Sequence, residues 1–414
     1  MLDKIKKIDV FTRNIIIVFA GTSLLNFINM IFQLLIAHKL TPTEFAAFNS
    51  LISIYMLVSA PLGTLQISIA KYASAFNARK EAAKVRHLIS GLFKGCSILA
   101  ALTLLLFWAG SVYIMGLLKI ESAALGYIFA LLLASAWLTP VFLGSLQGLE
   151  LFWWLSASNT ASGILKLSLA FVFIVLGFNI AGAMGALLVS SVAAIAIAYF
   201  PIKKYFTSPA DKDKAPYREI IYYMFPVAVS YFCFTALTTL DMVMVRYYFS
   251  AEDSGVYALA QMVGKIFLFL PGAVSIVMFP RTSGLSAQNL DTVSTLKKSL
   301  IYVFCLSISA CAVYNIIPGF TLTVLTGKAY LDSILLGRLF SFSMSFYTLL
   351  LILVTYFLSV RDLRFLKFLA GFTLLQVSAV ALYHPSLFSV QAIMCVSSIL
   401  LFGIHAILAF KNKR

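Results

Sequence analysis

The chain has 414 residues, of which 61% are hydrophobic and only 11% are charged. No soluble domain needs so much apolar surface, and runs of about 20 apolar residues, each able to cross a bilayer as a helix, follow one another closely. The alternating segments of about 10 residues that mark an outer-membrane barrel are missing. The net charge of +16 does not indicate nucleic-acid binding, because the basic residues cluster at helix ends and form no soluble basic domain.

The apolar spans predict an all-α polytopic membrane protein with about twelve transmembrane helices. In chain order the spans cover roughly residues 14–38, 45–69, 88–115, 123–148, 153–177, 181–201, 219–246, 255–280, 297–317, 331–359, 366–383 and 386–410. Gly177–Asn179 is the turn signal that separates the fifth span from the sixth. Segment 202–218 contains Pro and charged residues and is interpreted as a flexible linker. We therefore expect two six-helix lobes, 1–207 and 208–414.

The distribution of Lys and Arg predicts the orientation of the spans. Of the 31 basic residues, 24 fall at the span ends on the side of the N-terminus. The opposite ends hold Lys39, Lys119, Arg246 and Lys328. The positive-inside rule therefore predicts that both termini lie in the cytoplasm. Arg246 is expected to extend its side chain outward to the membrane interface. The outer loops are too short to hold a catalytic domain.

Enzyme and metal motifs are missing from the sequence. It contains no phosphate-binding loop, no His-Glu-x-x-His and no Gly-x-Ser-x-Gly. The four histidines and five cysteines are scattered without metal-ligand spacing. We therefore expect no catalytic residue, no metal site, no cofactor and no enzymatic activity. The basic N-terminus leads into a long first span, which is interpreted as a retained helix rather than a signal peptide.

Charged residues inside the spans are the main candidates for function. Lys166, Lys265 and Arg338 are cations in the fifth, eighth and tenth spans, and Asp241 is an acid in the seventh. Each costs at least about 2.5–3.5 kcal/mol at the centre of a bilayer. Such residues usually face a water-filled cavity or a partner charge. Three cations against one acid indicate an anionic substrate, because Lys and Arg bind phosphate oxygens well.

Polar residues accompany these charges. Gln261 lies one helical turn before Lys265, and the first span carries a polar stripe made of Thr22, Asn26, Asn29 and Gln33. These side chains are candidate cavity lining. The alternative is that the stripe forms hydrogen bonds between helices and that Asp241 pairs structurally with Arg246 or another cation.

One stretch occurs twice, 209 residues apart. The pairs Glu44 and Asp253, Ala46 and Gly255, Phe48 and Tyr257, and Gly63 and Gly272 align at this offset. Each copy has an apolar span, a short polar turn with an acidic residue, and a second apolar span that ends in a basic loop. We interpret the repeat as a transmembrane hairpin near the start of each half of a duplicated protein. Phe32 corresponds to Asp241, which indicates that the two halves have diverged.

Both copies also resemble a known family. Segment 40–48 (LTPTEFAAF), followed by Lys71-Tyr72, resembles the opening of oligosaccharide-unit flippases of the Wzx type. Segment 241–261, which contains DMVMV and AEDSGVYALAQ, resembles the start of their second half. The first copy has Ala46 where a glycine is typical, while the second has Gly255. These flippases belong to the multidrug/oligosaccharidyl-lipid/polysaccharide exporter superfamily.

The resemblance implies two six-helix bundles around a cavity that opens alternately to each side of the bacterial inner membrane. It implies an undecaprenyl-diphosphate-linked oligosaccharide as substrate, flipped for assembly of O-antigen (lipopolysaccharide), capsule or exopolysaccharide. The three span cations would then hold the diphosphate, the polar stripe would contact sugar hydroxyls, and Asp241 would be an H⁺ or Na⁺ coupling site. A polysaccharide polymerase and a chain-length regulator are the implied protein partners, alongside membrane lipid.

Three rival functions are weighed against the flippase. An ion-coupled multidrug antiporter of the same superfamily would favour an anionic or aromatic cavity for cationic drugs. A glycan polymerase or ligase would usually carry a sizeable outer loop with catalytic residues. A non-transporting scaffold has no use for charges inside its spans.

Overall fold

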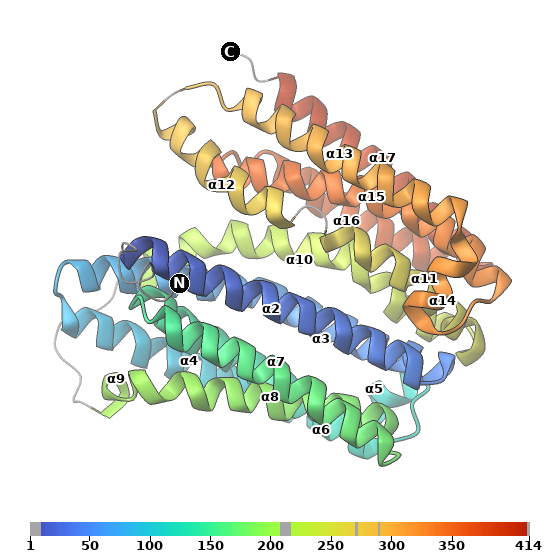
Figure 1. Cartoon of the computed structure of the whole chain (residues 1–414), viewed down its shortest axis with the longest axis horizontal. Coiled ribbons are helices and arrows are strands. Elements are labelled where there is room, and N and C mark those ends of the chain that lie inside the picture. The colour runs from blue at the N-terminus through green and yellow to red at the C-terminus, as the bar shows by residue number, and fades with distance from the viewer. Residues whose placement is uncertain (1–9, 208–216, 270–271, 289, 412–414) are drawn as a thin grey trace, which may run out of the picture. The chain divides into compact units, whose positions relative to one another are not determined.

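The computed structural model is built of α-helices, with no strand in any part of the chain that it describes (Figure 1). It describes residues 10–207, 217–269, 272–288 and 290–411. Most of the linker expected at 202–218 and the basic N-terminal segment lie outside these residues.

The chain folds into two compact units. The first contains residues 1–39 and 58–225, and the second contains residues 40–57 and 226–414. Two helices, α3 (Pro42–Ala78) and α10 (Tyr217–Tyr248), therefore contribute to both units. Each has a proline near the division, Pro61 in α3 and Pro226 in α10. Because a proline inside a helix removes a backbone hydrogen bond, each helix changes unit near its weakest point. The boundary between lobes expected at residues 207 and 208 stays a prediction.

The first unit comprises α2 (Val10–Lys39), the later part of α3, α4 (Ala82–Ala109), α5 (Ser111–Leu117), α6 (Ala123–Gly148), α7 (Phe152–Val175), α8 (Asn179–Ile202), α9 (Lys204–Thr207) and the start of α10. Helix α7 packs on α2 and α8, and α6 packs on α4 and α8. Small residues allow close packing: a Cβ at Gly144 or Gly148 of α6 would lie 2.7 Å from the carbonyl oxygen of Gln66 or Ala70 of α3. The two backbones are therefore in direct contact, as in small-xxx-small membrane interfaces.

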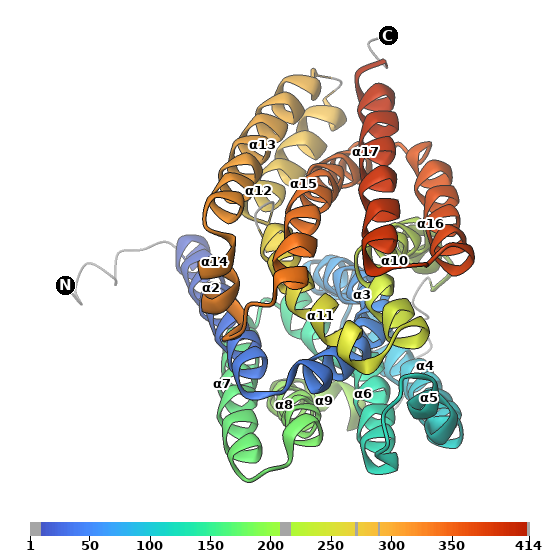
Figure 2. The same ribbon diagram turned by 90° about the vertical axis from the view of Figure 1, so that its right-hand side faces the viewer.

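The second unit comprises the first part of α3, most of α10, α11 (Ala251–Phe269), α12 (Gly272–Ala287), α13 (Val293–Ile316), α14 (Pro318–Thr326), α15 (Leu331–Ser359), α16 (Phe365–Leu382) and α17 (Leu387–Lys411). Helix α15 packs on α11, α13 and α17, and Figure 2 shows it between α13 and α17. Its side chains Phe340, Tyr347 and Leu350 are fully buried. This central helix organises the core of the second unit.

Most of the predicted spans correspond closely to helices. Within the described residues, 11 helices are long and apolar enough to cross a membrane. The spans predicted at 123–148 and 331–359 coincide with α6 and α15. The turn predicted at Gly177–Asn179 is confirmed, because Gly177 adopts a φ of +87°, which suits glycine, between the ends of α7 and α8. The fold is therefore an all-α membrane bundle, consistent with about twelve spans.

One predicted span is not a single helix. The third, 88–115, is divided at Gly110, where α4 gives way to the short helix α5. The eighth, 255–280, corresponds to α11, which ends at Phe269, and α12, which begins at Gly272, and the two residues between them lie outside the described part of the chain. Neither α11 nor α12 is by itself long and apolar enough to count as a span.

The repeated turn begins a helix in both copies. At the start of α3, the Thr41 backbone N–H donates to Glu44 Oε2 at 2.9 Å, and the Glu44 N–H donates to Thr41 Oγ1 at 3.3 Å. At the start of α11, the Asp253 N–H donates to Ser250 Oγ at 3.0 Å, and the Ser250 hydroxyl donates to Asp253 Oδ2 at 2.8 Å. A hydroxyl residue followed three positions later by an acid is a capping box. The repeated acids therefore have a structural role at helix N-termini.

The two copies of the turn meet inside the second unit. A Cβ added at Gly255 would lie 2.9 Å from the carbonyl carbon and from Cβ of Pro42. Only a glycine fits at this distance without a backbone shift. This contact explains why the second copy needs a glycine at this position.

Candidate functional site

A buried acid lies at the centre of the second unit. Asp241 of α10 is 2% exposed, and Tyr257 Oη of α11 donates to its Oδ2 at 2.8 Å. Gln261 Nε2, one turn further along α11, donates to Oδ2 at 3.1 Å and to Oδ1 at 3.3 Å. Two donors thus hold the carboxylate where no bulk water can do so.

Lys265 continues the same face of α11. Tyr257, Gln261 and Lys265 are spaced by four residues, so their side chains line one side of the helix. The Lys265 ammonium attracts the Asp241 carboxylate electrostatically, and its Nζ donates a hydrogen bond to Asn49 Oδ1 of α3. Asn49 is fully buried, and its Nδ2 donates to the Phe45 carbonyl at 2.8 Å. The lysine therefore lies between an acid on α10 and an amide on α3.

The polar network extends to the remaining helices of this unit. Tyr257 Oη also lies 3.3 Å from Gln391 Oε1 of α17, and Gln391 Nε2 donates to Ser343 Oγ of α15 at 2.8 Å. Tyr347 Oη of α15 donates to Gln376 Oε1 of α16 at 2.5 Å. Buried amides and hydroxyls therefore connect the core helices around Asp241, and each bond fixes the helix that contributes it.

One polar atom of this network has no partner in the described part of the chain. Gln261 Oε1 is buried and accepts no hydrogen bond there, while its Nε2 faces the carboxylate. A buried acceptor without a donor is unfavourable and calls for an explanation. Beside a carboxylate, an open carbonyl-type oxygen fits a proton carrier or a small cation.

The first unit contains a separate cationic site. Lys166 Nζ of α7 donates to Asn29 Oδ1 of α2 and lies 4.7 Å from the centroid of the Phe32 ring. The amide is neutral and the ring contributes a cation–π attraction. Lys166 thus has a neutral hydrogen-bond acceptor and an aromatic neighbour, and no carboxylate pairs with it among the described residues.

Close packing of α2 on α7 brings these side chains together. A Cβ at Gly21 would lie 2.9 Å from Ser156 Cβ, and the Ser156 hydroxyl donates to the Ile17 carbonyl at 3.2 Å. A Cβ at Gly163 would lie 2.9 Å from Leu25 Cδ1. Small residues thus let the helices approach, and Lys166 lies one turn beyond the second contact.

The other predicted site residues are placed differently. Asn26 is exposed on α2, whereas Gln33 is half-buried and has a partner. Arg338 is exposed on α15, where its neighbour Ser341 is buried and accepts from Asn315 Nδ2 at 3.3 Å. Lys166 belongs to the first unit and Arg338 to the second. The first unit brings Lys166 together with Asn29. The second unit brings Asp241 together with Gln261 and Lys265.

One sequence-based expectation about Arg246 is corrected. Arg246 does not extend outward, because it is 4% exposed. Asp241 is hydrogen-bonded to Tyr257 and Gln261, and the cation that attracts it is Lys265 of α11. A charged group inside a bundle finds partners on neighbouring helices, which residue spacing alone does not reveal.

A residue near the outer turn reinforces the contact between α3 and this unit. Lys328, in the loop after α14, donates from Nζ to the Leu40 carbonyl. Burial lowers the pKa of Lys328, an effect that the nearby Glu44 carboxylate opposes. The start of α3 is therefore attached to the second unit by Lys328, by Lys265 and by the contact of Gly255 with Pro42.

Solved structures with the same fold are transporters. The chain aligns with the lipid II flippase MurJ in an inward closed conformation with a TM-score of 0.74 at 14% identity, covering 96% of this chain and 88% of that one. An inward-facing multidrug resistance MATE family transporter of the MOP superfamily gives a TM-score of 0.71 at 14% identity, covering 94% and 96%. The chain therefore shares the multi-pass helical fold of these two proteins.

A family model refines this class. The model described as "Polysaccharide biosynthesis protein" matches residues 11–286, about two thirds of the chain. The chain therefore belongs to this family of polysaccharide biosynthesis proteins. No curated protein matches it in a sequence comparison. Family and fold together confirm the resemblance noted in the two repeated segments.

Proposed function

We propose that this protein flips undecaprenyl-diphosphate-linked oligosaccharide repeat units across the bacterial cytoplasmic membrane. The units would serve assembly of a surface polysaccharide such as O-antigen, capsule or exopolysaccharide. Two six-helix lobes, 1–207 and 208–414, would provide alternating access. Membership of the polysaccharide biosynthesis family and the fold shared with a lipid II flippase support this proposal.

The observation that carries the proposal is the way in which Lys166 is held. Its hydrogen-bond acceptor is the neutral amide of Asn29, and the aromatic ring of Phe32 supports its charge. An ion pair would cancel this charge, but an amide positions it without cancelling it. The first unit therefore offers a positive group inside the membrane that suits a diphosphate. Asn26 and Gln33, on the same helix, would contact the sugars.

Lys265 and Arg338 would provide the corresponding charge in the second unit. Lys265 is likewise bonded to a neutral amide, that of Asn49, although Asp241 offsets part of its charge. Arg338 is exposed, so its guanidinium is available to an anionic group. Substrate recognition would then use one cation in the first unit and two in the second.

Asp241 would couple transport to an H⁺ or Na⁺ gradient. Its carboxylate is buried beside the open oxygen of Gln261, and protonation or cation binding there would change the charge opposite Lys265. A change at this position would alter how strongly Lys265 interacts with an anionic substrate. A polysaccharide polymerase and a chain-length regulator would act on the product.

A multidrug antiporter is the second candidate, because MATE transporters share the fold. Its cationic substrates would be repelled by Lys166, which has no carboxylate partner in the described chain. A glycan polymerase or ligase is less well supported. Such enzymes usually carry a sizeable outer loop with catalytic residues, whereas the outer loops predicted from this sequence are short.

Reconstitution in proteoliposomes tests the proposal. A fluorescent undecaprenyl-diphosphate oligosaccharide in the inner leaflet becomes accessible to an impermeant quencher when it is flipped. We expect the wild type to expose it and Lys166→Ala to fail, with a labelled cationic drug transported by neither. Drug transport by the wild type without flipping of the glycolipid would overturn the proposal in favour of the antiporter.

A further inference from the structure

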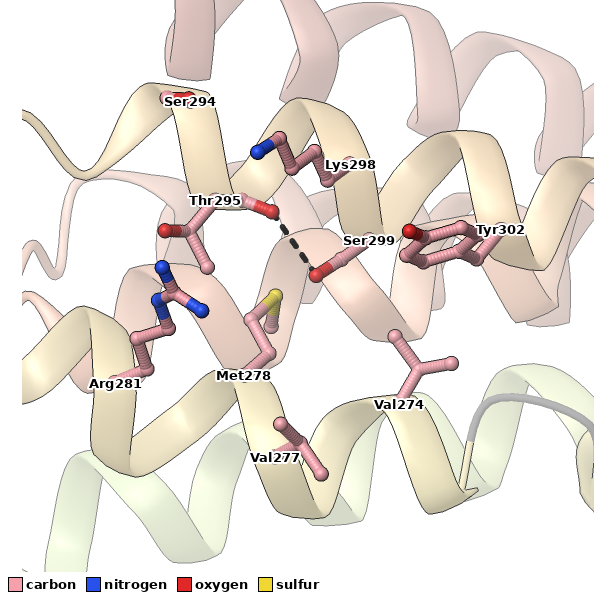
Figure 3. Close-up of a pocket in the computed structure, with 9 residues that line it drawn as sticks. All are labelled: Val274, Val277, Met278, Arg281, Ser294, Thr295, Lys298, Ser299 and Tyr302. Atoms are coloured by element: carbon pink, nitrogen blue, oxygen red, sulfur yellow. Dashed lines mark hydrogen bonds between the residues drawn. The ribbon is translucent and has the colours of Figure 1, made fainter.

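A groove separate from the buried networks lies between α12 and α13 of the second unit. Its volume is about 480 Å³ (Figure 3). The two helices run antiparallel and pack side by side, as Figure 1 also shows. Residues from both helices line the groove, and none of them belongs to the network around Asp241.

The polar groups lie at one end of the groove. Arg281 of α12 and Lys298 of α13 face each other across it, with Thr295 between them in Figure 3. The described residues contain no carboxylate paired with either cation. Two positive charges therefore converge on one small volume lined by hydroxyl groups, an arrangement that binds phosphate oxygens.

The apolar groups lie at the other end. Val274 and Val277 precede Arg281 on α12, and Tyr302 follows Lys298 on α13, so both helices become apolar in the same direction. Val274 lies about 10 Å from Arg281 along the helix axis, at 1.5 Å per residue. The groove therefore has a cationic end and an apolar end, about a headgroup's length apart.

Exposed apolar side chains border the groove. Val277 is 67% exposed and Tyr302 is 62% exposed, and Ile301, the neighbour of Tyr302 on α13, is exposed as well. Such side chains on a membrane helix face hydrocarbon. The excess of Lys and Arg assigns the end of α12 and the start of α13 to the cytoplasmic side. The groove thus opens to lipid near the inner interface.

We propose that this groove binds the phosphate headgroup of an anionic lipid in the inner leaflet. Arg281 and Lys298 contact the phosphate, the hydroxyl of Thr295 adds a donor, and a lipid chain lies along Val274, Val277 and Tyr302. Charge complementarity selects the phosphate, and the apolar end selects a lipid over a soluble phosphate. The proposal does not depend on which substrate the protein transports.

The test is lipid binding to the purified full-length protein, measured by native mass spectrometry in detergent. The probe is phosphatidylglycerol. Diacylglycerol has the chains without the phosphate, and sodium phosphate has the charge without the chains. Undecaprenyl diphosphate is the second lipid, and its competition with phosphatidylglycerol ranks the two sources of a lipid phosphate.

A matched variant lies beside the groove. Lys297 neighbours Lys298 in the chain, but its ammonium lies 6.0 Å from the centroid of the Phe410 ring. We expect Arg281→Ala/Lys298→Ala to weaken phosphatidylglycerol binding by about tenfold or more, because two charge-assisted hydrogen bonds are lost. Lys297→Ala should bind as the wild type does, and Arg281→Lys should retain part of the affinity.

Several outcomes would overturn the proposal. Equal phosphatidylglycerol binding by Arg281→Ala/Lys298→Ala and by Lys297→Ala would mean that Arg281 and Lys298 are solvated and do not contact the lipid phosphate. Displacement of phosphatidylglycerol by diacylglycerol or by sodium phosphate would remove the argument for a lipid phosphate. An unchanged unfolding temperature of the double variant, measured in the same detergent, excludes misfolding as the cause of any loss.

Discussion

Lys265 on α11 donates a hydrogen bond to the side-chain oxygen of Asn49 on α3, although the two residues are separated by 216 positions in the chain. Asn49 belongs to the short segment 40–57, which packs with the second unit while the rest of α3 belongs to the first. The Lys265 ammonium is therefore hydrogen-bonded to segment 40–57, which comes from the N-terminal half of the chain but belongs to the second unit. Stability and transport should both depend on this bond.

Asn49→Leu removes the acceptor and leaves the Lys265 ammonium in apolar surroundings. We expect it to destabilise the protein by about 1.5–3 kcal/mol, the range for hydrogen bonds to charged groups. Lys265→Met should cost a similar amount, because it leaves the buried Asp241 carboxylate without its neighbouring cation and the Asn49 oxygen without its donor. The double variant should recover part of the stability but no transport. Unfolding in mixed micelles measures the free energies, and additive losses in the double variant would argue against a direct bond.

Lys166→Ala tests the cationic site of the first unit. It removes an intramembrane charge that Asn29 positions, so we expect surface polysaccharide to fall by about tenfold or more. Lys166→Arg should retain part of the export. Lys367→Ala is the matched control, because Lys367 is exposed at the start of α16 and its ammonium lies near the Phe368 ring. Immunoblotting of membranes checks protein levels, and normal export by Lys166→Ala would refute the site.

The helical architecture could be predicted from the sequence because each span has a strong local signal. Apolar length, flanking basic residues and the Gly177–Asn179 turn are properties of short segments. The break at Gly110 between α4 and α5 was missed, because the apolar run continues through this residue with no charged residue or proline to mark it.

The site could be predicted only as a set of isolated charges. Lys166, Lys265 and Asp241 were found because a charge in an apolar span is rare. Asn49 and Gln391 were missed because an uncharged amide in a span gives a weak signal and its partner is distant in the chain. Tyr257 had a signal, since it lies four residues before Gln261 and eight before Lys265. Packing of distant helices decides which of these residues meet.

Asp241→Asn tests ion coupling. The amide keeps the size of the side chain but cannot ionise, so transport should lose its dependence on an imposed H⁺ or Na⁺ gradient. Tyr257→Phe is the companion variant, because it removes one 2.8 Å hydrogen bond and leaves the carboxylate. It should retain gradient dependence at a reduced rate. Flipping in proteoliposomes with and without each gradient is the measurement, and unchanged gradient dependence in Asp241→Asn would exclude this residue as the coupling site.

Gly255→Ala tests the contact between the two copies of the repeated turn. The new Cβ would lie 2.9 Å from two atoms of Pro42, one of them backbone, so the start of α3 must shift. Overpacking of this kind costs about 1–3 kcal/mol, which exceeds the gain of about 1 kcal/mol that alanine brings to a helix.

Gly371→Ala in α16 is the matched control for this substitution. A Cβ at Gly371 meets no atom within 4 Å, so alanine should leave the protein unchanged or stabilise it slightly. Unfolding temperatures of the two variants in one detergent give the comparison. Since the shift caused by Gly255→Ala acts on the segment that carries Asn49, flipping should slow in this variant as well. Equal unfolding temperatures for the two variants would mean that Pro42 and Gly255 do not touch in the folded protein.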